Sequence, residues 1–203
     1  MLQHAQHILG VEIVFMLEHA DMLLQSMEMH SIPQIQQRKN TSKKATSKFP
    51  AMLFPRGAEL YALYTDMHDT IFVRTQGHEG VFFLQEHWQQ LTLVLPKDSI
   101  CRAIVYRNKD GNLVLGVYDV LRLSDVDQKS PIFERQKMLC SLFHNVSTGP
   151  SIVQHWVGEE GCLLEHMQTK AFFYTLPFEI DNMLRIDEHQ DKYSVVLRPL
   201  LMG

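Results

Sequence analysis

The chain has 203 residues, of which 45% are hydrophobic and 21% are charged, and its formal net charge is -4 at pH 7. This composition is typical of a globular protein and excludes a global positive field that would bind nucleic acid nonspecifically. The longest apolar run, residues 13–17, is far shorter than the ~20 residues that span a bilayer, so we expect no membrane segment.

The cysteine and histidine residues predict a reducing compartment and no metal site. Cys101, Cys140 and Cys162 lie far apart and none belongs to a C-x-x-C pair, so we expect free thiols and neither a zinc site nor a disulfide framework. His4 and His7 stand three residues apart, but no carboxylate or second histidine pair near them completes a ligand set. The N-terminus lacks a basic start and a cleavage signal. We expect an intracellular protein, nuclear or cytoplasmic, with no cofactor and no metal.

Two segments precede the main part of the chain. Within residues 1–33, the stretch 4–30 has apolar side chains near helical spacing, and Pro33 ends the pattern. This predicts an N-terminal helix that either packs on the rest of the chain or docks a partner. Residues 34–48 are polar and lack periodicity, which is typical of a linker. The five cations of this basic linker suit a solvated surface, RNA phosphates or an import signal, and they are Arg38, Lys39, Lys43, Lys44 and Lys48.

Residues 49–203 are predicted to form an α+β domain of antiparallel sheets with flanking helices. Short β-branched or aromatic runs between turn residues indicate strands over 60–64, 70–74, 80–84, 99–107, 113–121, 152–157, 162–166, 172–176 and 193–197. A helix is expected to begin at Ser130, with Pro131 in its first position and Gly149-Pro150 after its end. A shorter helix is expected over 87–91.

Five short motifs between Phe54 and Leu164 occur in a characteristic order. They are Phe54-Pro55-Arg56-Gly57, Phe72 to Gly77 around Arg74, Cys101-Arg102-Ala103, Val117 to Leu121 around Asp119 with Arg135 on the following helix, and Glu160-Gly161-Cys162-Leu163. The ordered set resembles the nucleotidyltransferase superfamily of messenger-RNA guanylyltransferases and DNA or RNA ligases. The resemblance implies that the fifth motif lies on a strand. It also implies a degenerate nucleotide pocket formed by Phe54, Arg56, Gly57, Arg74, Asp119, Arg135, Glu160 and Gly161.

The groups that carry the chemistry of this superfamily are missing. Its members transfer a nucleotide through a covalent lysine intermediate and need carboxylates to hold Mg²⁺. Here the first motif has no lysine, and Arg56 replaces its acid. Cys101-Arg102-Ala103 removes the acid of the third motif. We therefore expect no catalysis by this chain, and a structural role is the simplest explanation for Asp119 and Glu160.

The strand Asp119-Val120-Leu121-Arg122-Leu123, followed by a helix with Arg135, is similar to one noncatalytic branch of the superfamily. This branch is the guanylyltransferase-like domain of the cap-specific mRNA (nucleoside-2'-O-)-methyltransferase that makes cap-1, which also lacks the lysine. The resemblance implies a nuclear module associated with mRNA cap 2'-O-ribose methylation. It would scaffold a methyltransferase domain or bind capping proteins, transcription proteins or RNA. The chain has no Gly-rich turn for S-adenosylmethionine, so we expect a fragment or a stand-alone relative that does not methylate by itself.

Two alternatives stay open. The first is a cap-binding domain of the snurportin kind, in which aromatic faces stack on a methylated guanine. Trp88 and Trp156 are the candidates for cap stacking, with Tyr118 behind them, although packing in the core is the simpler role for a tryptophan. The second is an active nucleotidyltransferase with a displaced nucleophile such as Lys48, Lys97 or Lys170.

Overall fold

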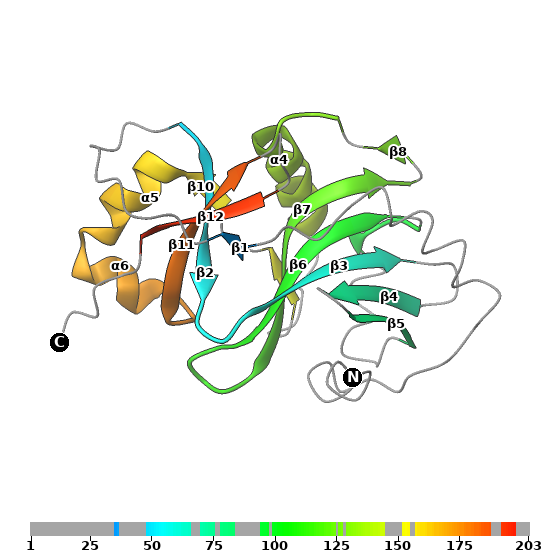
Figure 1. Cartoon of the computed structure of the whole chain (residues 1–203), viewed down its shortest axis with the longest axis horizontal. Helices are drawn as coiled ribbons and strands as arrows, with labels where there is room; N and C mark the ends of the chain where they lie inside the picture. Colours follow the sequence, from blue (N-terminus) through cyan, green and yellow to red (C-terminus); the bar gives the residue numbers. More distant parts are fainter. Residues whose placement is uncertain are drawn as a thin grey trace. The chain divides into compact units, whose positions relative to one another are not determined.

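The computed structural model describes residues 35–36, 48–65, 70–75, 78–83, 94–97, 99–124, 126–127, 129–144, 152–154, 157–187 and 192–197. Within these residues, helices combine with two largely antiparallel sheets, which confirms the α+β class (Figure 1). The described residues form two compact units. Unit 1 takes them from Glu59–Val105 and Leu113–His155, and unit 2 takes them from Pro33–Ala58, Tyr106–Asn112 and Trp156–Gly203. The helices predicted over 4–30 and 87–91 lie outside the described residues, and the boundaries predicted at 33 and 48 stay predictions.

Unit 1 is built on a seven-stranded sheet in the order β5-β4-β3-β6-β7-β8, and β9 pairs in parallel with β7. Its strands are β3 (Glu59–Thr65), β4 (Thr70–Thr75), β5 (His78–Phe83), β6 (Ile100–Arg107), β7 (Leu113–Leu123), β8 (Val126–Asp127) and β9 (Ile152–Gln154). The first five confirm the strands predicted between residues 60 and 121. β6 and β7 are buried along most of their length. Both faces of these two strands are therefore covered, so a strict polar–apolar alternation is not expected in them.

One helix, α4 (Ile132–Phe143), packs against β7 and β9 in unit 1. It buries Ile132, Gln136 and Leu139, which share one helical face. The predicted start is one residue too early, because Pro131, which was expected in the first helical position, has an extended ψ of 151° and stands just before the helix. Its carbonyl oxygen accepts hydrogen bonds from the backbone N–H groups of Glu134 and Arg135. None of the helices in the described ranges is both long and apolar enough to cross a membrane.

Unit 2 contains a five-stranded sheet in the order β1-β12-β11-β2-β10, in which only the β1–β12 pair is parallel. Its strands are β1 (Ile35–Gln36), β2 (Pro50–Pro55), β10 (Val157–Glu159), β11 (Ile180–Asp187) and β12 (Lys192–Leu197). β12 confirms the last predicted strand. The linker prediction is wrong at residues 35–36, because the edge of β12 offers backbone partners to a segment that has no strand periodicity of its own.

The central pair of this sheet, β2 and β11, was not among the strands predicted from periodicity. All six residues of β2 are buried, so the segment shows a continuous apolar run between two prolines instead of alternation. The prolines occupy its first and last positions, where a missing N–H does least harm to a sheet. β11 has a register irregularity between Ile180 and Asn182, which breaks the alternation at its start.

Two predicted strands of unit 2 are helices. Residues 162–166 belong to α5 (Glu160–Met167) and residues 172–176 mostly to α6 (Lys170–Thr175). Short apolar runs fit a strand or a buried helix equally well. The burial pattern of α5 is that of a helix, because its buried residues, Glu160, Leu163 and Met167, are spaced three and four apart and share one helical face. The fifth motif therefore begins a helix and does not lie on a strand.

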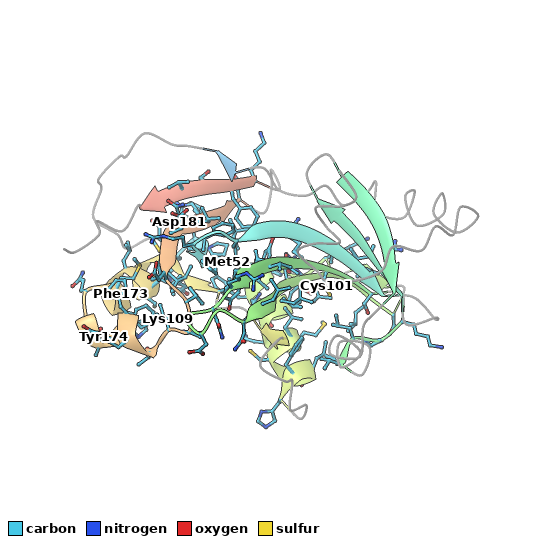
Figure 2. The ribbon with its side chains drawn as sticks, turned by 90° about the horizontal axis from the view of Figure 1, so that it is seen from below. Met52, Cys101, Lys109, Phe173, Tyr174 and Asp181 are labelled. Atoms are coloured by element: carbon cyan, nitrogen blue, oxygen red, sulfur yellow. The ribbon has the colours of Figure 1, made fainter. Side chains whose placement is uncertain are left out.

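The turn between β6 and β7 belongs to unit 2 and contacts α6. The backbone N–H of Lys109 donates to the carbonyl of Pro177 at 2.8 Å, and Lys109 Nζ donates to the carbonyl of Phe173 at 2.9 Å. Figure 2 shows Lys109 near Phe173 and Tyr174. Lys109 therefore supplies a donor to a carbonyl near the C-terminal end of α6. Its positive charge also interacts favourably with the negative end of the helix dipole. The turn itself is closed by the side chain of Asn108, whose Oδ1 accepts from the backbone of Asp110 and Asn112.

Candidate functional site

In unit 1, the fourth motif forms a buried ion-pair cluster. Asp119 lies in β7 with no exposed surface, and Arg135 from α4 approaches its carboxylate with two donors. Arg135 Nε lies 2.7 Å from Oδ1 and Nη2 lies 2.9 Å from Oδ2. Such a bidentate pair is shorter and stronger than a neutral hydrogen bond and fixes the relative position of both groups. The pair therefore ties α4 to β7.

The third motif supplies a second cation to the same carboxylate. Arg102 lies in β6, its side chain is 9% exposed, and its Nη1 lies 3.5 Å from Oδ2 of Asp119. Asp119 Oδ1 also accepts the backbone N–H of Val120. Both carboxylate oxygens thus have protein donors. A charged residue inside an apolar strand, as in I-C-R-A-I-V and V-Y-D-V-L, is the sequence signal that predicts a buried pair of this kind.

Cys101, next to Arg102, is buried in the same region. Burial, followed by the nearby negative charge of Asp119, raises the pKa of its thiol well above the ordinary value. The thiolate is the reactive form of cysteine, so this side chain is inert near neutral pH. Cys140 and Cys162 are exposed.

We expect a thiol reagent such as iodoacetamide at pH 8 to alkylate Cys140 and Cys162 in the folded protein and to leave Cys101 unmodified. Unfolding in urea removes the burial and exposes the third thiol. Peptide mass spectrometry of samples alkylated with and without urea measures the three sites separately. Alkylation of Cys101 in the folded chain at the rate of Cys140 would contradict its burial.

In unit 2, the fifth motif forms a second carboxylate–arginine pair. Glu160 is 3% exposed at the start of α5, and Arg185 reaches it from β11. Arg185 Nε lies 2.8 Å from Oε2, and its Nη2 lies 3.0 Å from Oε1. The Arg185 guanidinium also lies over the ring of Phe49, with its carbon 4.6 Å from the ring centroid. Neither Phe49 nor Arg185 is among the site residues that the sequence motifs predict.

The first motif, also in unit 2, ends β2 and begins a turn. Phe54 is 6% exposed and forms part of the core. Arg56 pairs with Glu179 at 2.8 Å, and both side chains are more than half exposed, so this pair stabilises the fold by at most about 1 kcal/mol. Gly57 has a φ of +69°, in the left-handed region that glycine adopts without a steric penalty. A turn therefore follows β2 at Arg56 and Gly57.

The structure brings the predicted site residues together only in part. Asp119 and Arg135 are in contact in unit 1, and Arg74 lies on β4 of the same unit. Phe54, Arg56, Gly57, Glu160 and Gly161 belong to unit 2. Trp88 and Trp156, the candidates for cap stacking, lie outside the described residues.

The chemistry of the two clusters is that of satisfied ion pairs. No group of three or more His, Cys, Asp or Glu in the described ranges is arranged to hold a metal ion. The sequence matches no known family model and no curated protein.

Proposed function

We propose that this chain is a noncatalytic module of the guanylyltransferase-like kind. In this proposal it is a part or relative of the nuclear methyltransferase that makes cap-1, and it works by binding. Its partners are a methyltransferase domain, proteins of the capping or transcription machinery, or RNA. The observation that carries the proposal is the state of the two carboxylates in its motifs, Asp119 and Glu160, each of which is held by arginine.

A carboxylate that holds Mg²⁺ for phosphoryl transfer must present an oxygen to the ion. Both oxygens of Asp119 accept hydrogen bonds from guanidinium groups inside unit 1. Both oxygens of Glu160 accept from Arg185 inside unit 2. Releasing Asp119 to a metal would leave the largely buried Arg135 and Arg102 without their counter-charge, which costs several kcal/mol. These groups favour a stable scaffold over a metal site.

The position where the superfamily has its nucleophilic lysine also argues against catalysis. Phe54 fills the first motif with an apolar ring in the core of unit 2, where a lysine would have to attack the α-phosphate. Lys48 and Lys97, two of the candidates for a displaced nucleophile, are exposed to solvent. The resemblance behind the proposal rests on the first four motifs, since the fifth begins a helix here, and Glu160 supports only the noncatalytic part.

The noncatalytic part of the proposal is tested by incubating the full chain with radiolabelled GTP or ATP and Mg²⁺. We expect no protein-bound label after denaturing electrophoresis. A wild-type guanylyltransferase with an intact lysine motif is the positive control. An adduct that survives denaturation and disappears in Lys48→Arg or Lys97→Arg would contradict the proposal and identify the nucleophile.

The binding part is tested by titrating the chain into a cap 2'-O-methyltransferase domain and following association by calorimetry. We expect saturable binding in the absence of any nucleotide. The Tyr174→Ala and Arg56→Ala variants, which change exposed side chains of unit 2, locate the contact surface. Absence of heat and of co-elution on size exclusion would remove the methyltransferase domain from the set of partners.

A further inference from the structure

We draw no further inference here: the strongest candidate, the surface patch of α6 around the exposed ring of Tyr174 beside the Lys109 turn, carries nothing because no contact among the described residues shows what covers it.

Discussion

Replacement of Asp119 by asparagine is expected to lower the free energy of unfolding by about 3–5 kcal/mol. The substitution keeps the size of the side chain and removes its charge. Arg135 and Arg102, whose side chains are 11% and 9% exposed, then lose the carboxylate that they share. Removing one partner of a buried pair costs more than the pair contributes, because the remaining charge stays desolvated. Domains have only about 5–15 kcal/mol of stability, so the variant loses a large part of it.

Urea denaturation followed by far-ultraviolet circular dichroism measures this loss, and α4 also contains its control. Glu134 and Lys137 form an ion pair at 2.9 Å with both side chains more than half exposed. Glu134→Gln is expected to change stability by less than about 0.5 kcal/mol, because water screens an exposed pair. If Asp119→Asn and Glu134→Gln changed the unfolding midpoint by the same amount, the buried cluster would not hold α4 on the sheet.

Replacement of Met52 by alanine is expected to destabilise unit 2 by about 2–5 kcal/mol. Met52 has no exposed surface and lies in β2, with Leu184 of β11 and Val157 of β10 as its neighbours in register (Figure 2). Truncation removes buried apolar atoms and leaves a cavity that the strands on both sides cannot fill. The loss appears in the same denaturation experiment, and hydrogen exchange at the β2–β11 pairs reports it locally.

The volume-conserving variant Met52→Leu separates a cavity from a sequence-specific contact. We expect it to cost less than about 1.5 kcal/mol, because hydrophobic exchanges of similar volume are tolerated in cores. The Tyr174→Ala variant should stay within about 0.5 kcal/mol of the wild type, as is usual for exposed positions. A similar loss for Met52→Leu and Met52→Ala would show that the methionine is required for a reason other than volume.

The strands β3 to β7 could be predicted from the sequence because their signals are local, whereas β8 was not predicted and the strand predicted over 152–157 is divided between β9 and β10 of different sheets. Turn residues separate β-branched and aromatic runs from residue 60 to 121, and each run is recognisable without its neighbours. The elements of unit 2 gave weaker signals. β2 is buried on both faces between two prolines, and β11 begins with a register irregularity, so neither shows the alternation that marks a half-covered strand. The apolar residues of α5 and α6 are too few to separate a helix from a strand without knowing which are buried.

The candidate sites follow the same distinction. Asp119 and Arg135 were both singled out, but only the packing of α4 on β7 makes them a pair. Glu160 was singled out without its partner. Arg185 and Phe49 come to it from segments on either side of unit 1 in the sequence, and no local pattern marks such a meeting. An isolated charge inside an apolar strand predicts one half of a buried ion pair. This signal marks Arg102 and Asp119 in the sequence, but it does not identify the partner of either residue.

The pairing of β2 has a consequence for the order in which the chain can fold as it is made. β2 is translated before every strand of the seven-stranded sheet, yet its two neighbours, β10 and β11, are translated after all of them. While the ribosome produces residues 59–155, neither neighbouring strand of the wholly apolar β2 has been made, so both of its edges are unpaired. An uncovered strand edge can pair with other copies of the chain. Ribosome-bound chains that stop near residue 155 should therefore be the form most prone to aggregate.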